Sequence, residues 1–300
     1  MKMGQPGRRF LSNGIKAGLL LTLAMFCMTA FAAEFVGTNI NSGQIVYIVT
    51  PKTSLTITAT GSKPDGVILG PYQEIIYVVS GAGAVHMFNP YSHVDTTLAS
   101  GLSTPVDLVM EPACKTILVS DIGVNKIYRI NLTTHVLTTL YNGPDKIQGL
   151  TFDTSGNLFA ADNQLNAIVQ LDTVSGSILN QTSAGSPLNS LEGLTYDGYT
   201  KQLFATSNSG QVLYEVTTDL STIATLSFTA EPVLHGIVSD GKGNLYVVGA
   251  NSTTSFVLQY GISSGITQTL NNISGLEDIA PLFFGPCIKG RTGDSACGEN

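Results

Sequence analysis

The chain has 300 residues, which is enough for one large all-β domain or two ordinary ones. Only 12% of the residues are charged, 43% are hydrophobic, and the formal net charge is −7. An acidic chain without a basic cluster repels phosphate backbones, so the composition argues against nucleic acid as a partner.

The N-terminus has the pattern of a secretory signal peptide over residues 1–32. Its first half carries four basic side chains and no acid, an apolar run follows, and Ala30-Phe31-Ala32 offers a small-x-small cleavage site. We expect cleavage after Ala32 and export to the periplasm or the extracellular space. The alternative is a retained membrane anchor, although the apolar run is short for a span of about 20 residues. Because the leader removes four positive charges and no negative one, the net charge of −7 falls to −11 in the mature chain, which contains no further apolar run of membrane length.

The mature chain repeats one phrase with a period typical of β-propeller blades. The clear copies are GLTFDTSGNLFAAD (149–162), GLTYDGYTKQLFATS (193–207) and GIVSDGKGNLYVVG (236–249), and weaker copies begin at positions 66 and 107, so that successive copies start 41 to 44 residues apart. Each copy indicates two apolar strands joined by a polar turn, and a third alternating strand and a Thr-rich fourth strand follow it. Four antiparallel strands per repeat predict one propeller blade.

The two ends of the chain supply a sixth blade. Residues 34–60 align with the last three strands of a repeat, and LEDIAPLFF (276–284) aligns with the missing first strand. We therefore predict an all-β, six-bladed β-propeller over residues 33–284, with four antiparallel strands per blade and the last blade closed by the N-terminal strands plus the C-terminal strand. Closure ties the ring shut and removes open edges. The alternative, a β-sandwich, does not repeat one phrase five times at near-constant spacing.

Residues 285–300 are Gly-rich and polar and are predicted to form a tail that holds two of the three cysteines left after cleavage. In an oxidising compartment we expect a disulfide. Proximity favours Cys287 with Cys297, which closes a small loop. The alternative pairs Cys114 with Cys287, which would lock the closing strand.

Two stretches, GLTFDTSGNLFAADNQLNAIVQLD and VSDIGVNKIYRIN, resemble the NHL-repeat propellers and the related gluconolactonase-like propellers. The family phrase runs strand, Asp, turn, Gly-Asn-Leu-Tyr, strand, Asp, turn, Asn, and its positions are matched in this chain by Asp153, Gly156, Asn157, Leu158, Phe159, Asp162 and Asn166, by Asp240, Gly243, Asn244, Leu245 and Tyr246, and by Asp121 and Asn125. The resemblance implies the fold but no single activity, because such propellers include lactonases, lyases, receptors and scaffolds without chemistry. We expect the matching Asp and Asn side chains to hold turns through hydrogen bonds to the backbone.

Candidate ligand positions lie at the mouth of the central channel, where the innermost strand of each blade begins. The residue before each inner-strand Gly or Asp defines one position per blade. The predicted ligand-binding set is Asp65, Asp107, Gln148, Glu192, His235, Glu277 and Asp278. Carboxylate oxygens and one imidazole on a common axis suit a divalent cation such as calcium, and the candidate ligands are Asp65, Glu192, His235 and Glu277.

The metal-ligand pattern of the gluconolactonases is matched at one position of this set and departed from at others. Glu192-Gly193 is similar to the Glu-Gly that carries the first metal ligand in that family, whereas Gln148 and His235 stand where the family has Asn or Asp. We assign no catalytic residue, since the chain has no Gly-x-Ser-x-Gly elbow and no phosphate loop.

Three functions from different classes compete. We favour a monomeric binding module that engages a protein, peptide or glycan through the channel mouth. The alternative is a metal-assisted hydrolase, lactonase-like or esterase-like, or a lyase acting at the same mouth, in which a bound metal would polarise a carbonyl group. A third possibility is a purely structural component of the cell envelope.

Overall fold

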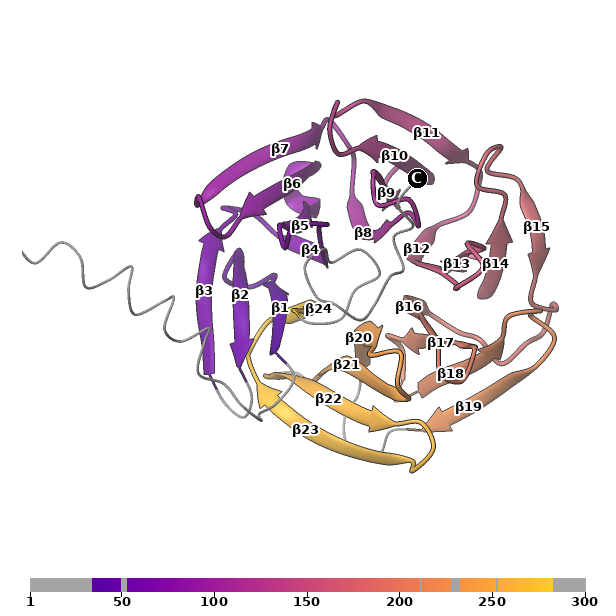
Figure 1. The fold of residues 1–300 in the computed structure, drawn as a ribbon. Coiled ribbons are helices and arrows are strands. Elements are labelled where there is room, and N and C mark those ends of the chain that lie inside the picture. Colours follow the sequence, from indigo (N-terminus) through magenta and orange to yellow (C-terminus); the bar gives the residue numbers. More distant parts are fainter. Residues whose placement is uncertain (1–33, 50–52, 211, 228–232, 252, 283–300) are drawn as a thin grey trace, which may run out of the picture. The chain divides into compact units, whose positions relative to one another are not determined.

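The described residues form six four-stranded antiparallel sheets around a central axis in the computed structural model (Figure 1). The structure describes residues 34–49, 53–210, 212–227, 233–251 and 253–282. This arrangement confirms the predicted six-bladed propeller. The predicted signal peptide and the predicted tail, with Cys287 and Cys297, lie outside the described residues. No helix in the described part of the chain is long and apolar enough to cross a membrane.

Each sheet is one blade, whose strands run in order from the innermost to the outermost. Blade 1 contains β24 (Leu276–Pro281), β1 (Glu34–Asn39), β2 (Gln44–Val49) and β3 (Thr53–Ala59). Blade 2 contains β4 (Pro64–Leu69), β5 (Ile75–Val79), β6 (Ala84–Asn89) and β7 (Val94–Ser100), with the short 3₁₀ turn η1 (Ser80–Ala82) between β5 and β6. Blade 3 contains β8 (Pro105–Met110), β9 (Thr116–Asp121), β10 (Lys126–Asn131) and β11 (Leu137–Asn142).

The other three blades follow the same order. Blade 4 contains β12 (Ile147–Phe152), β13 (Leu158–Asp162), β14 (Ala167–Leu171) and β15 (Ile178–Gln181). Blade 5 contains β16 (Leu191–Asp197), β17 (Gln202–Ser207), β18 (Val212–Thr217) and β19 (Ile223–Ser227). Blade 6 contains β20 (Val233–Ser239), β21 (Asn244–Ala250), β22 (Ser255–Gly261) and β23 (Ile266–Asn272).

Blade 1 closes the ring in the predicted way. β24 pairs antiparallel with β1, with Val36 opposite Ala280 and Gly37 opposite Ile279. Each inner strand contacts the inner strands of both neighbouring blades, from β24 through β4, β8, β12 and β16 to β20, which contacts β24 again. The first and last described strands therefore lie side by side (Figure 1).

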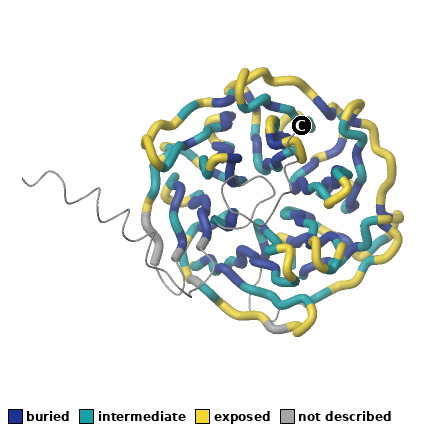
Figure 2. Tube along the Cα trace, in the orientation of Figure 1, coloured by how far each residue is buried: buried dark blue, intermediate teal, exposed yellow. Residues whose placement is uncertain are grey.

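The hydrophobic core is divided among the six gaps between neighbouring blades. Each gap holds one cluster of buried side chains from the two blades that face it. Between blades 1 and 6, for example, the rings of Phe35 and Tyr246 lie 4.9 Å apart between centroids. Blades stack face to face, so the second strands are covered on both sides: every residue of β5 and β13 is buried, whereas every residue of the outermost β15 is exposed (Figure 2).

Candidate functional site at the channel mouth

A β-bulge at the start of each inner strand aims one side chain at the channel axis. Where the inner strand pairs with the second strand, the register passes from Pro64 to Val67 in blade 2 and from Leu191 to Leu194 in blade 5, and it shifts in the same place in the other blades. The first residue skipped in each blade is Asp65, Val106, Gln148, Glu192, His235 or Glu277. We call these six residues the polar ring. Bulges commonly redirect a side chain in this way beside functional sites.

The residue after each polar-ring position sets the spacing between inner strands. In four blades it is glycine, and a Cβ on Gly149 would lie 2.6 Å from the carbonyl oxygen of Glu192 in the next blade. The absence of a side chain at these glycines therefore permits the close approach of neighbouring inner strands. In the other two blades an aspartate takes this place and bonds to the neighbouring blade: Asp107 accepts from the backbone N–H of Leu150 at 2.7 Å, and Asp278 accepts from that of Val67 at 2.9 Å.

Asp107 and Asp278 thus differ from the other predicted site residues. Both line the central cavity, but their carboxylates are engaged in holding adjacent inner strands together. Desolvation by burial raises the pKa of Asp107 to about 7, although the backbone bonds from Leu150 and Leu108 act in the opposite direction. Burial also raises the pKa of Asp278 well above its usual value, and the charge of Asp107 adds to this.

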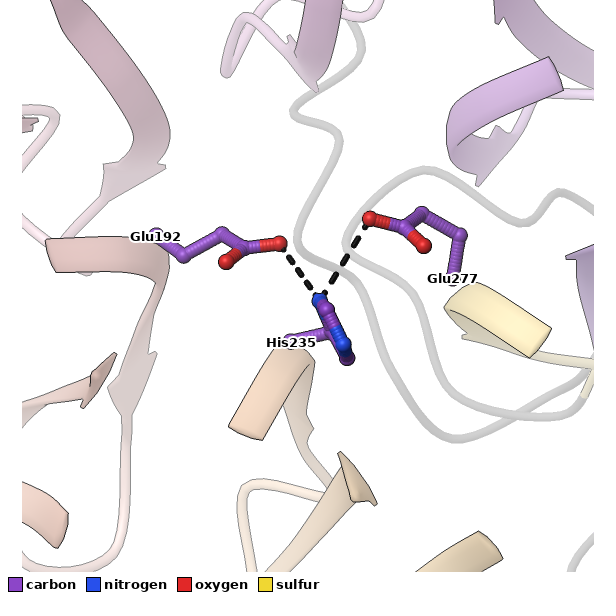
Figure 3. Close-up of side chains that lie close together, drawn as sticks. All are labelled: Glu192, His235 and Glu277. Atoms are coloured by element: carbon purple, nitrogen blue, oxygen red, sulfur yellow. Dashed lines mark hydrogen bonds and ion pairs between the residues drawn. The ribbon is translucent and has the colours of Figure 1, made fainter. Parts of the chain in front are cut away.

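His235 lies between two glutamates from the adjacent blades (Figure 3). Its Nδ1 is 2.8 Å from Oε1 of Glu192 and 3.4 Å from Oε1 of Glu277. All three side chains are largely buried, with exposed fractions of 16 to 18%. Burial alone would lower the pKa of the imidazole, but the hydrogen bonds and negative charges of the two glutamates outweigh it and raise the pKa to about 10. The two glutamates therefore favour the imidazolium form of His235 at neutral pH.

Two glutamates face this one imidazolium, so one negative charge remains unbalanced. Burial raises the pKa of Asp65 well above its usual value, and the charges of Glu277 and Glu192 raise it further, which favours the neutral form of Asp65. Oε2 of Glu192 is buried and has no hydrogen-bond partner in the described part of the chain. A carboxylate oxygen buried without a partner costs free energy that a bound donor or cation would recover.

The same residues form a candidate metal centre. Glu192, His235 and Glu277 each offer one ligand atom, and these atoms all lie within 4.8 Å of one another. Of the four predicted ligands, Asp65 is not part of this group. The donor set fits a divalent ion that accepts both oxygen and imidazole nitrogen. Such an ion would have to displace the proton of His235, so its binding would strengthen as the pH rises.

Two hydroxyl side chains on second strands fix the backbone of the polar ring and are not part of the predicted site. Thr206 in β17 donates to the carbonyl oxygen of His235 at 2.6 Å, and Ser120 in β9 donates to that of Gln148 at 2.7 Å. Both side chains are completely buried. The sequence contains a signal for these two residues: each is a hydroxyl side chain in an otherwise apolar strand. A hydroxyl group buried in such a strand needs a hydrogen-bond partner.

The aspartates and asparagines shared with the NHL-type phrase act on turns, as expected. Asp121 accepts from the backbone N–H groups of Ser103, Thr104 and Gly123. Asp153 and Asp240 hold the turn between first and second strands in blades 4 and 6. The remaining three bond to nearby backbone groups in the same manner, namely Asn125, Asp162 and Asn166.

Comparison with known proteins supports the fold. No protein-family model matches the chain, and no curated protein is detectably similar in sequence. Among solved structures, a chain of the nidogen/laminin complex superposes with a TM-score of 0.70 at 14% identity, covering 84% of this chain and 99% of that one.

Two structures of one enzyme, virginiamycin B lyase, are also similar to this chain. Virginiamycin B lyase from Staphylococcus aureus gives a TM-score of 0.61 at 16% identity, covering 79% of this chain and 83% of that one. A histidine-to-alanine variant of that lyase, described as catalytically inactive and bound to quinupristin, gives 0.61 at 17% identity, covering 79% and 84%. At these identities the likeness is one of fold: the chain is a six-bladed β-propeller resembling nidogen and virginiamycin B lyase.

Proposed function

We propose that this protein is an exported binding module that takes up a positively charged group of a peptide or protein ligand at its channel mouth. The observation that carries the proposal is the charge of the polar ring, in which the carboxylates of Glu192 and Glu277 flank a single imidazolium. A neutral ligand would leave this excess unbalanced, whereas a cationic group would complement it.

The surroundings of His235 show that the polar ring stabilises a positive charge. Two glutamates hold its imidazolium against the cost of burial, and the buried Oε2 of Glu192 remains without a partner in the described residues. The fold also occurs in the nidogen/laminin complex, a protein–protein assembly, which supports a binding role for a propeller of this type.

The test is binding of a fluorescein-labelled tetralysine peptide, followed by fluorescence anisotropy at physiological ionic strength. We expect saturable binding to the mature protein and none of the same peptide with acetylated side chains. The double variant Glu192→Gln, Glu277→Gln should bind at least tenfold more weakly, because it removes two buried charges from the ring.

A matched control separates the mouth from the acidic surface in general. Glu215→Gln also removes a negative charge, but Glu215 lies on the third strand of blade 5, away from the channel lining. This variant should bind like the parent protein. Equal binding by the parent and the double variant, with both folded by circular dichroism, would place any interaction outside the channel mouth and refute the proposal.

Export is part of the proposal and has its own test. It is supported by the charged, apolar and small-x-small regions of residues 1–32. Expression of the full chain in a bacterial host should give a processed protein outside the cytoplasm whose N-terminal sequence begins at Ala33. An unprocessed protein in the cytoplasm or the membrane fraction would refute export.

A metal-assisted lyase or hydrolase is a second candidate, favoured by the clustering of Glu192, His235 and Glu277 within 4.8 Å. The structural likeness to an enzyme that loses activity when one histidine is replaced is consistent with this. An imidazolium with a pKa of about 10 does not act as a base at neutral pH, so base catalysis by His235 would require a cation that displaces its proton.

Elemental analysis and a turnover assay decide between the candidates. A stoichiometric divalent metal in the purified protein, together with conversion of quinupristin that is lost in His235→Ala, would support the enzyme. Liquid chromatography with mass spectrometry separates a hydrolysed product, heavier by one water, from an eliminated product of unchanged mass. Binding of tetralysine without metal and without conversion would support the binding module.

A further inference from the structure

The central cavity has two zones that differ in polarity. Three residues beyond the polar ring, each inner strand presents a second ring of side chains, which we call the middle ring. Its members are Ile68, Val109, Thr151, Thr195, Val238 and Ala280. All six line one cavity of about 520 Å³, together with five residues of the polar ring. The bulge sets three residues of the inner strand against two of its partner strand, so the two rings lie about 7 Å apart along the strands.

The middle ring is uncharged and mostly apolar. Aliphatic side chains occupy four of its six positions, and the two threonines stand next to each other in blades 4 and 5. The hydroxyl of Thr195 already accepts a bond from the backbone N–H of Ser239 at 3.3 Å. An apolar segment of a ligand would therefore meet side chains that have no charge to desolvate.

The carboxylates on the far side of the middle ring do not compete for a cation. Asp153 accepts from Ser155 and from both nitrogens of Asn157, and Asp240 accepts from Lys242 and Asn244 in the same way. Both oxygens of each carboxylate are used. In the polar ring, by contrast, Oε2 of Glu192 is buried without a partner in the described residues.

We infer that the channel selects a ligand with an ammonium group at the end of a linear aliphatic chain. The ammonium group lies at the polar ring beside Glu192 and Asp65, and the chain runs along the middle ring. This inference rests on the proposed function and adds a ligand class to it. The volume of about 520 Å³ is within the range of small-molecule sites.

The inference is tested by isothermal titration with n-alkylamines of increasing length, from butylamine to decylamine, at neutral pH. Each methylene that enters the middle ring should tighten binding about fourfold, which corresponds to about 0.8 kcal/mol per buried CH₂. The gain in affinity should stop once the alkyl chain extends beyond the middle ring. Alcohols and carboxylic acids of equal length should not bind measurably. Nα-acetyl-lysine amide, whose side chain carries the same ammonium group on four carbons, should match butylamine if the ligand is a lysine side chain. It should not bind if the site admits only a small-molecule amine.

Two variants locate the effect. Val109→Thr is nearly isosteric and replaces a methyl group of the middle ring with a hydroxyl, so it should reduce the gain in affinity with chain length. Glu192→Gln should weaken all amines alike. If tetralysine and butylamine bind but longer chains bring no gain, the inference fails and the proposed function stands. If no amine and no lysine peptide binds, both fail.

Discussion

At the scale of the residue, His235 shows two opposing effects on one side chain. Its burial disfavours the charged form, and two glutamates at 2.8 and 3.4 Å favour it more strongly. Removing either glutamate would leave a buried positive charge with one partner, which is costly in a low-dielectric site. The pair therefore has to be treated as one ionic unit with the imidazolium.

These pKa values predict how stability depends on pH. The pKa of His235 is about 10 in the folded protein and near 6.5 when unfolded, so its contribution is fully present below about pH 6.5 and is lost as the pH rises through 10. The pKa of Asp107 is about 7 in the folded protein, against an ordinary value of 3.8. Its contribution to stability is therefore also lost as the pH rises through 7. We expect the melting temperature to fall between pH 6 and pH 10.

Thermal unfolding followed by circular dichroism measures this dependence. His235→Gln serves as the control and should flatten the curve between pH 7 and pH 10, because it removes the group that releases a proton there. A melting temperature that rises or stays constant from pH 6 to pH 10 in the parent protein would contradict the ionic account of the polar ring.

The identities of the site residues were accessible from sequence, and their geometry was not. Aligning the repeats placed Glu192, His235 and Glu277 at equivalent positions, because each blade is a copy of the same unit. Their inward orientation depends on a bulge that interrupts the two-residue alternation of the strand, so a sequence pattern cannot indicate it. The different roles of Asp107 and Asp278 depend on the neighbouring blade, whose backbone they bind.

At the scale of the element, glycines with positive φ determine how turns fit against adjacent strands. Gly83 follows η1 with φ of 60°, and a Cβ there would overlap the carbonyl oxygen of Leu102. Gly101 has φ of 79° but open space around its Cα. The two positions share an unusual backbone conformation and differ in steric surroundings.

Alanine substitutions at Gly83 and Gly101 separate the cost of a left-handed backbone conformation from the cost of a steric clash. Gly101→Ala should cost about 1 kcal/mol, the penalty of a left-handed conformation for a residue with a Cβ. Gly83→Ala should cost clearly more, because the backbone of Leu102 must move as well. Urea denaturation of both variants measures the difference, and equal losses would show that the turn after η1 yields to a Cβ without cost.

At the scale of the whole ring, the strand β24 joins the two ends of the propeller. It buries Leu276 and Ile279 almost completely and supplies the Asp278 carboxylate that binds blade 2. Leu282, directly after β24, is partly buried and packs against the cluster between blades 1 and 2. The sequence predicted this closure because residues 34–60 lack the one strand that 276–284 supplies, once the repeats are aligned.

Deleting residues 275–300 should therefore leave an unfolded or insoluble product. Each buried aliphatic side chain contributes about 1.5–3 kcal/mol, and the backbone bonds to β1 are lost as well, against a typical total stability of about 5–15 kcal/mol. Deleting only residues 285–300 is the control. It should leave the fold intact, with a lower melting temperature because it also removes Cys287 and Cys297. An unchanged melting curve after the longer deletion would contradict closure by β24.

A disulfide is expected to reinforce the ring. Cys114, in the turn between β8 and β9, is 8% exposed and has the disulfide-bonded form, with its partner outside the described residues. We therefore expect non-reducing peptide mapping of the mature protein to find Cys114 cross-linked to Cys287 or Cys297. A map with free Cys114 and a bond between Cys287 and Cys297 would support the pairing favoured by proximity instead.

The channel mouth holds an excess of negative charge that stabilises a buried cation, and this is the claim on which the proposed function depends. An NMR titration of the His235 imidazole, assigned by comparison with His235→Gln, measures it directly. We predict a pKa of about 10 in the parent protein and a lower value in Glu192→Gln, since that variant removes the nearer glutamate. A pKa near 6.5 in the parent, unchanged in the variant, would contradict the claim.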